Sequence, residues 1–156
     1  MVYIILNKKK IIRKRKNVLT QKNGNSLVVH KIGKEGLKVD ASFGERKIHE
    51  ILEQAGLNYK MEYIFPDLRS PNGRPLRFDF VVFDDDGNID FIIEYQGKQH
   101  YEPSSKFGGK KGFYQQQFND NKKRRFCALH DFTLIEIPYT EENLISYDYI
   151  MEKAGY

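Results

Sequence analysis

The chain has 156 residues, 40% of them hydrophobic and 30% charged, which suits a single folded domain large enough to bury a core of its own. No stretch approaches the roughly 20 apolar residues of a membrane-spanning helix, and the apolar N-terminus precedes its lysines, the wrong order for a signal peptide. The net charge is +5, and the single cysteine, Cys127, excludes an intramolecular disulfide and a zinc site of several thiolates, so we expect a cytoplasmic protein.

The positive charge is concentrated at the start of the chain. Residues 1–38 contain eleven Lys or Arg and one acid, a formal +10, whereas the rest of the chain carries a formal −5. This indicates a polyanionic partner, most often nucleic acid, although a solvated basic arm without a partner has the same composition. Residues 8–16 show little amphipathic periodicity, which argues against a membrane partner. Tyr3–Leu6 and Leu27–His30 are candidate short strands, and the sequence leaves open whether residues 1–40 fold onto the main domain.

A helix and a strand are predicted where the basic segment ends. Ser42 and Glu45 have the spacing of a capping box, and apolar residues then recur at helical intervals. Gly56 follows at a position suited to a helix C-terminus. Tyr59–Phe65 is rich in aromatic residues and predicts a strand that ends at Pro66.

A hairpin is predicted next. Arg77–Phe83 and Phe91–Gln96 have strand composition, and Asp-Gly between them is the strongest short-range hairpin signal. A two-residue turn at Asp86–Gly87 puts Asp79 directly opposite Glu94, with side chains on the same face of the sheet. A three-residue turn would shift this register and remove the pairing.

Carboxylates placed directly opposite each other repel and destabilise a sheet, so we expect something in the folded protein to compensate their charge. A divalent cation between Asp79 and Glu94 would remove the repulsion, because Mg²⁺ is commonly held by one or two carboxylates. The structural alternative is an exposed hairpin face that tolerates two acids.

The remaining elements complete an α/β pattern. After a loop at 97–112 we expect a helix over 113–129, a strand over 132–137 and a final helix over 141–152. The order α-β-β-β-α-β-α predicts one domain over residues 41–156, with a mixed central sheet flanked by helices.

Polar residues interrupt an otherwise apolar strand at the predicted site. Glu94 and Gln96 share the face of Asp79, and such breaks in pattern tend to mark functional positions. An acid at the end of one strand, followed by acid-x-lysine on the next, is the signature of the PD-(D/E)XK nuclease superfamily. The chain resembles this signature, with Gln96 in place of the lysine, and the resemblance implies a restriction-endonuclease-like core.

The resemblance extends to a second pattern. Very-short-patch-repair-like nucleases and a related group of phage homing endonucleases share a Glu-Asp-x-His-Asp succession. The matching positions here are Glu45, Asp79, Gln96, His100 and Asp120. The similarity covers roughly residues 42–140 and does not include residues 1–40. The chain lacks the cysteines for the structural zinc site of the repair enzymes, which favours the homing-type branch.

This family resemblance implies an endonuclease that uses Mg²⁺ or Mn²⁺, without zinc or an organic cofactor, to hydrolyse double-stranded DNA in a bacterial or phage-infected cell. Asp79, Glu94 and the backbone carbonyl of Tyr95 would hold the metal, which activates a bound water. Gln96 would orient the nucleophile or the phosphate. Repair or junction-resolving nucleases and an inactive DNA-binding relative remain alternatives, and a homodimer is left open.

Three further residues have both a catalytic and a structural interpretation. His100 would act as the base, since imidazole exchanges protons near neutral pH, or it is a surface histidine. Asp120 would hold His100 or a water, or it forms a solvated ion-pair cluster with Lys123 and Arg124. Glu45 would be a second-metal or water ligand, or it only completes the capping box.

Basic side chains of the N-terminal segment, of the loop before the second helix and of a second cluster from Lys122 are the candidate DNA contacts. The loop before the second helix combines lysines with glycines that allow close approach to a phosphate backbone, although a mobile surface loop has the same composition. The candidates are Lys8, Lys9, Lys10, Arg13, Lys14, Arg15, Lys16, Lys106, Lys110, Lys111, Lys122 and Lys123.

Overall fold

The computed structural model describes residues 41–156, so the predicted strands at Tyr3–Leu6 and Leu27–His30 lie outside the described residues, as do the basic side chains from Lys8 to Lys16. Along the chain the elements are α2 (Phe43–Gln54), β1 (Asn58–Arg69), β2 (Pro75–Phe83), β3 (Ile89–Gln96), the 3-10 turns η1 (Lys98–His100) and η2 (Ser105–Phe107), α3 (Gly109–Leu129), β4 (Leu134–Pro138), η3 (Tyr139–Leu144) and α4 (Tyr147–Lys153). Across this part of the chain, every helix is too short or too polar to cross a membrane.

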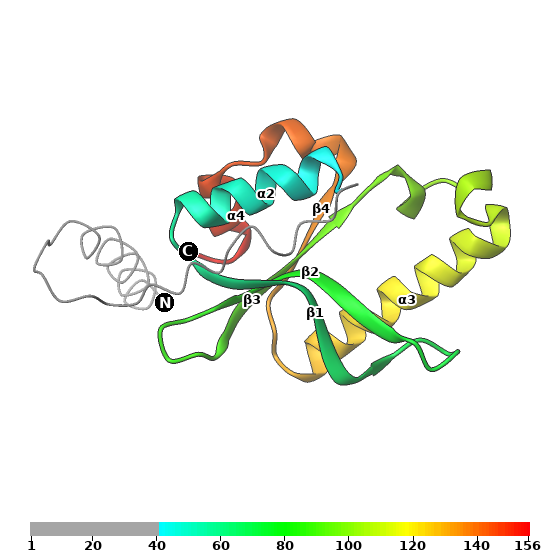
Figure 1. The fold of residues 1–156 in the computed structure, drawn as a ribbon, viewed down its shortest axis with the longest axis horizontal. Helices are drawn as coiled ribbons and strands as arrows, with labels where there is room; N and C mark the ends of the chain where they lie inside the picture. Colours follow the sequence, from blue (N-terminus) through cyan, green and yellow to red (C-terminus); the bar gives the residue numbers. More distant parts are fainter. Residues whose placement is uncertain (1–40) are drawn as a thin grey trace, which may run out of the picture.

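The four strands form one mixed sheet in the order β1-β2-β3-β4. β1, β2 and β3 are antiparallel neighbours, whereas β3 and β4 are parallel and are joined through α3. Parallel neighbours need such a crossover connection, because a tight turn reverses the chain and can join only antiparallel strands. The predicted mixed α/β architecture with a central sheet flanked by helices is confirmed (Figure 1).

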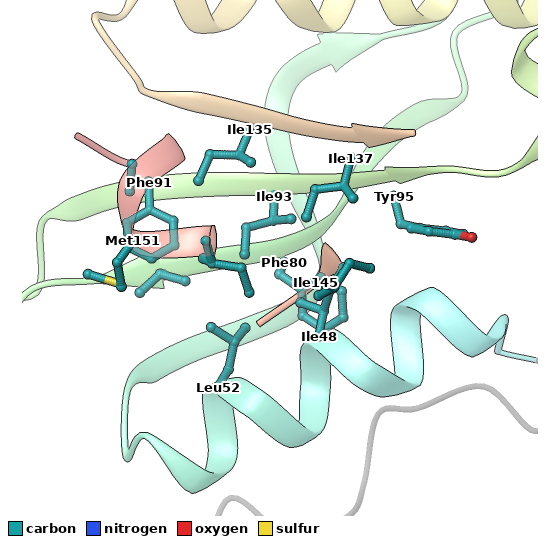
Figure 2. Packing of buried hydrophobic residues seen from close by; sticks show 13 residues of the cluster. Ile48, Leu52, Phe80, Phe91, Ile93, Tyr95, Ile135, Ile137, Ile145 and Met151 are labelled. Carbon is teal, nitrogen blue, oxygen red and sulfur yellow. The ribbon is translucent and has the colours of Figure 1, made fainter. Parts of the chain in front are cut away.

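The larger core lies between one face of the sheet and the helices α2 and α4. Ile48 and Leu52 on α2 point towards the sheet, where Phe80 and Ile93 are fully buried (Figure 2). The capping box at Ser42 starts α2 as predicted. This packing fixes the first turn of α2 over the ends of the central strands.

A second core lies between the other face of the sheet and the C-terminal end of α3. Phe126 and Cys127 are the buried residues of this helix, and they cluster with Phe78. Burial raises the pKa of the Cys127 thiol to about 12, which makes it a poor nucleophile at neutral pH.

Several element boundaries differ from the sequence prediction. β1 continues beyond Pro66 to Arg69 through an irregular register, and α3 starts at Gly109 rather than at residue 113. The predicted helix 141–152 is confirmed only in its second half, where α4 lies, because its first half forms the 3-10 turn η3. Ile145 leaves the helical region with ψ of 116°, and the Ser146 side chain then caps α4 by accepting from the backbone N–H of Tyr149.

The predicted two-residue turn at Asp86–Gly87 is also wrong. The Asp84 N–H donates to the Asn88 carbonyl at 2.9 Å, and the Gly87 N–H donates to the Asp84 carbonyl at 3.2 Å. The turn therefore has three residues, and Gly87 occupies its left-handed position with φ of 83°. The Asp84 carboxylate supports the turn by accepting from the N–H of Asn88 at 2.8 Å.

A bulge cancels the shift that this longer turn introduces. Phe83 pairs with Ile89 but Val82 pairs with Phe91, so Asp90 is one extra residue on β3. Beyond the bulge Phe80 pairs with Ile93, which is the predicted register. Continued by one residue, this register puts Asp79 opposite Glu94.

Candidate functional site

A cavity of about 470 Å³ lies where β2 begins and β3 ends, between the first turn of α2 and the side of α3. Five of the six predicted catalytic residues line it, and they come from separate elements: Glu45, Asp79, Glu94, His100 and Asp120. Tyr95 and Lys123 also line the cavity, together with amide side chains of α3. The cavity thus collects carboxylates, one imidazole, the ammonium of Lys123 and the guanidinium of Arg77, which also pairs with Glu62 at 3.3 Å.

Asp79 is the acid at the centre of this arrangement. Its Oδ2 accepts the backbone N–H of Tyr95 at 2.8 Å, which fixes the carboxylate at the end of the β2–β3 pairing. Burial raises the pKa of Asp79 to about 6, and the charges of Glu45 and Glu62 act in the same direction. The Tyr95 hydrogen bond and Lys123 lower it only in part.

Glu94 forms a buried ion pair with Lys123. The Lys123 ammonium donates to both carboxylate oxygens, at 2.9 and 3.0 Å, and the side chains are 7% (Glu94) and 14% (Lys123) exposed. Burial, and then the charge of Asp79, raises the pKa of Glu94 to about 8. Burial by itself would lower the pKa of Lys123, but Glu94 outweighs it and the pKa is raised. The ammonium therefore stays charged beside the buried carboxylate of Glu94 and the partly buried one of Asp79.

This position differs from the sequence prediction for Lys123, which treated it as a DNA contact or as a member of a solvated cluster with Asp120. Instead the side chain points into the cavity, and its ammonium lies 5.3 Å from the centre of the Phe78 ring. Arg124 is drawn away to Glu136, with nitrogen–oxygen distances of 3.0 and 2.8 Å. The solvated cluster is therefore not formed.

Glu62 is a cavity-side acid that sequence reasoning missed. Met61 pairs with Phe80 and Tyr63 pairs with Phe78, so Glu62 on β1 stands across from Asp79 on β2. Its backbone has φ of 50°, a left-handed conformation that is uncommon for a residue other than glycine. One oxygen each from Glu45, Glu62 and Asp79 lie within 4.8 Å of one another. These three acids are the group best placed to share a cation.

Glu45 satisfies both interpretations that its sequence position allows. Its carboxylate accepts the Ser42 N–H at 2.7 Å, and its own N–H donates to the Ser42 hydroxyl at 3.2 Å. The same side chain lines the cavity beside Asp79. The capping box therefore holds the carboxylate in place rather than competing with a role at the site.

His100 is held by α3 through both ring nitrogens. Nδ1 lies 2.9 Å from Asp120 Oδ2, and Nε2 lies 2.7 Å from the Gln116 amide nitrogen. With Nδ1–H donating to the carboxylate, Nε2 keeps its lone pair and accepts from Gln116. The predicted contact between His100 and Asp120 is present, and both side chains are mostly buried, at 12% and 11% exposed.

Gln96 lies away from the cavity. Its amide nitrogen donates to Glu136 on β4, and its amide oxygen accepts from the Tyr101 hydroxyl. The side chain is thereby committed to a buried network at the β3–β4 edge. The positively charged group beside Glu94, the second acid of the nuclease signature, is instead the ammonium of Lys123 on α3.

The other predicted basic contacts that the structure describes lie at the two ends of α3. Lys106 is in η2, and Lys110 and Lys111 are exposed on the first turn of the helix. Lys122 donates to the backbone carbonyl of Arg69 at the end of β1. Three exposed lysines therefore remain at the N-terminal end of α3, beside the cavity-lining residues of the same helix.

Comparison with known proteins finds short matches to viral proteins. The chain is 43% identical over 58 residues to the uncharacterized protein 307L of Invertebrate iridescent virus 6, covering 36% of this chain and 29% of that protein. It is 44% identical over 57 residues to the uncharacterized protein 094L of Frog virus 3, covering 35% and 37% respectively. The chain thus spans about a third of the length of these curated relatives. No family model matches, and no solved structure matches.

The raised pKa values of the buried acids predict that the metal-free protein loses stability as the pH rises. In the unfolded chain the pKa of Asp and Glu is about 4. Between pH 4 and 8, Asp79 and Glu94 therefore bind more protons in the folded state than in the unfolded state. The resulting stabilisation is complete below about pH 4 and is lost as the pH rises through about 6 for Asp79 and about 8 for Glu94.

We expect Asp79→Asn to flatten this decline by about 2–3 kcal/mol between pH 4 and 7, since one pKa unit corresponds to about 1.4 kcal/mol. Urea unfolding in EDTA across this range measures it. Glu50→Gln replaces an exposed acid on α2 and should keep the wild-type slope. Equal slopes for Asp79→Asn and wild type would contradict the assignment of the proton to this site.

Gly44 lets the first turn of α2 approach β3, and its replacement should displace Glu45. A Cβ on Gly44 would lie 2.1 Å from a ring carbon of Tyr95, whose hydroxyl is fixed by Glu142. We expect Gly44→Ala to lower the free energy of unfolding by about 1–3 kcal/mol through this overlap, although alanine normally favours a helix. Gln54→Ala, exposed on the same helix, is the control for helix propensity and should be neutral or stabilising. An increase in the stability of the Gly44→Ala protein would show that the Tyr95 ring moves aside at no cost.

Proposed function

We propose that the chain is a divalent-metal-dependent endonuclease that hydrolyses phosphodiester bonds of double-stranded DNA on a restriction-endonuclease-like core. The observation that carries this proposal is the convergence of Glu45, Asp79, Glu94, His100 and Asp120 on one cavity. These residues are distant in sequence and occur in the order that the nuclease resemblance implies. The homing-type branch, action in the cytoplasm and a homodimer belong to the same proposal.

Mg²⁺ or Mn²⁺ fits the acids of the cavity. When bound, such a cation lowers the pKa of a water ligand and stabilises charge on phosphoryl oxygens. Asp79 would be the central ligand, with Glu45 and Glu62 on one side of it and Glu94 on the other. One oxygen of each of Glu45, Glu62 and Asp79 already lies within 4.8 Å of the other two, so these carboxylates would hold the cation after a modest approach of their side chains.

Lys123 supplies the positive charge that Gln96 does not. In the acid-x-lysine signature the ammonium follows the second acid along the same strand. Here the ammonium reaches Glu94 from α3 and lies at the cavity wall. It is placed to hold a phosphate oxygen or the attacking water, and its presence favours an active enzyme over an inactive DNA-binding relative.

His100 would accept a proton from the attacking water. Asp120 holds Nδ1–H, so Nε2 is the nitrogen with the free lone pair. Gln116 contacts Nε2 at 2.7 Å and would have to give way to that water. The pair His100–Asp120 would thus orient a base while the acids of β2 and α2 would hold the cation.

Cleavage of plasmid DNA in Mg²⁺ tests the proposed metal ligand. We expect Asp79→Asn to cut at least about 100-fold more slowly than wild type, because it removes the central ligand from an otherwise intact site. Mg²⁺ should raise the melting temperature of wild type but not of this variant. Asp148→Asn, an exposed acid on α4, is the matched control and should behave as wild type in both assays. Normal cleavage by Asp79→Asn would place the active site elsewhere.

The role of His100 is tested separately. General bases contribute about 10²–10⁴-fold to the rate, so His100→Ala should slow single-turnover cleavage by at least about 100-fold at saturating Mg²⁺. Its affinity for DNA, measured in Ca²⁺, should stay within about twofold of wild type, since the basic side chains are untouched. A rate loss below about threefold would reduce His100 to a structural residue.

A further inference from the structure

The hairpin formed by β1 and β2 carries positive charge at its tip. Residues 68–78 contain three arginines, Arg69, Arg74 and Arg77, and no Asp or Glu. In Figure 1 this end of the hairpin projects at the lower right of the molecule, away from the helices α2 and α4. The sequence analysis did not count these arginines among the candidate DNA contacts, because no local pattern connects them with the acids of the site.

The base of the hairpin is fixed beside the candidate site. Arg77 lines the cavity and lies two residues before Asp79 on β2. Leu68 and Leu76 are buried in the same cluster as Phe126, which belongs to the C-terminal end of α3. The hairpin therefore keeps one position relative to the cavity and to the helix that forms its other wall.

Hydrogen bonds also hold the tip in one conformation. The Ser70 N–H donates to the Arg74 carbonyl at 2.8 Å, and the Gly73 N–H donates to the Ser70 carbonyl at 2.9 Å. Gly73 closes this three-residue turn in the left-handed conformation, with φ of 76°. The Arg69 guanidinium spans the turn by donating to the carbonyls of Pro66 and Gly73, at 3.2 and 3.1 Å. A stiff loop loses little conformational freedom when it binds a partner.

Arg74 is the arginine of the tip that the fold leaves available. Arg69 is used within the turn, and Arg77 pairs with Glu62 at 3.3 Å. The side chain of Arg74 is exposed, and within residues 41–156 it forms no hydrogen bond or ion pair. A planar guanidinium on a rigid, exposed support suits the recognition of paired hydrogen-bond acceptors on another molecule.

The dimensions of the hairpin match the major groove of duplex DNA. That groove is about 12 Å wide and admits a two-stranded β-ribbon. Arg74 immediately precedes β2, so at about 3.3 Å per residue it lies about 17 Å along the strand from Asp79. Since base pairs are about 3.4 Å apart, Arg74 would meet bases about five pairs from a phosphate held at the cavity.

The two ends of the hairpin suit different parts of DNA. Arg77 stands at the cavity, where a phosphate contact fixes the duplex in place but carries no sequence information. Arg74 lies at the tip, which is the part of a ribbon that reaches the base edges in the groove. Arginine donates two hydrogen bonds to N7 and O6 of guanine, and this is the commonest specific contact between a side chain and a base.

We propose that the β1–β2 hairpin enters the major groove of the DNA beside the cut phosphate, where Arg74 reads a guanine. This proposal rests on the proposed nuclease function and adds a sequence preference to its substrate class. The preference depends on one base edge at a defined distance from the cavity and requires no change in the structure of the duplex.

Selection from random DNA tests the base contact without cleavage. The full-length protein in Ca²⁺ is mixed with duplexes of randomised sequence, and the duplexes that it retains are sequenced. We expect wild type to enrich a motif that contains a guanine, and Arg74→Ala to lose at least about tenfold of the discrimination at that position alone. On a duplex that carries the motif, wild type in Mg²⁺ should cut within about five base pairs of this guanine.

A matched control removes the same charge elsewhere. Arg125→Ala replaces an exposed arginine of α3 that does not line the cavity, and it should keep the guanine preference. Thermal unfolding confirms that both variants are folded.

The outcomes distinguish this proposal from the nuclease proposal. A guanine preference that survives Arg74→Ala overturns it, as does a wild type that enriches no motif. Equal weakening of Arg74→Ala on every sequence also overturns it, because Arg74 would then contact a phosphate. A cut more than about one helical turn, or 10 base pairs, from the guanine overturns the placement of the hairpin.

Cleavage and recognition are scored separately. Asp79-dependent cleavage without an Arg74-dependent preference leaves the nuclease proposal standing alone. An Arg74-dependent preference without cleavage in Mg²⁺ supports the base contact and overturns the nuclease proposal.

Discussion

Asp79 and Glu94 lie beside a single ammonium, that of Lys123, and this imbalance of charge governs the site around them. Burial is the main cause that raises the pKa of both acids, to about 6 for Asp79 and about 8 for Glu94, and the charge of Asp79 adds to it at Glu94, so binding of a proton relieves an unfavourable charge at this place. The core on the opposite face of the sheet supports the same strands with Phe80 and Ile93, which keeps the acids from separating. In the proposed metal site, stability without metal and affinity for metal would therefore be opposed. A substitution that relaxed the repulsion between the acids would also weaken the attraction of the site for a cation.

The pairing of Asp79 with Glu94 could be predicted from the sequence, although the turn that was expected to produce it does not exist. The three-residue turn shifts the register by one, and the bulge at Asp90 shifts it back. Hydrophobic alternation explains why the outcome is robust, since a slip by one residue would carry Phe80 and Ile93 to the other face. Burial sets the register, and the turn and the bulge adapt to it. Helix α2 was predictable for a simpler reason, because its capping box and apolar spacing are local signals.

Glu62 and Lys123 could not be found in the same way, because each reaches the site through a long-range feature. A two-residue turn at Asn72–Gly73 would have placed Glu62 opposite Phe83, whereas the irregular stretch of β1 between Ile64 and Arg69 moves it across from Asp79. Lys123 depends on how α3 crosses the sheet, which is set by the packing of its last turn. The local spacing on α3 suggested a surface ion-pair cluster, but a long helix offers several faces and packing selects among them.

The same packing explains why α3 contributes to the candidate site mainly through polar side chains. Its only buried residues, Phe126 and Cys127, anchor its C-terminal end, so the rest of this 21-residue helix is held to the molecule chiefly by polar contacts. Lys123 binds Glu94 and Gln116 binds His100, so two of these contacts belong to the cavity itself, whereas Lys122 and Arg124 bind Arg69 and Glu136 outside it. The hydrogen bond between Gln116 and His100 Nε2 therefore fixes the N-terminal half of α3 beside the imidazole, and the ion pair of Lys123 fixes its C-terminal half beside Glu94.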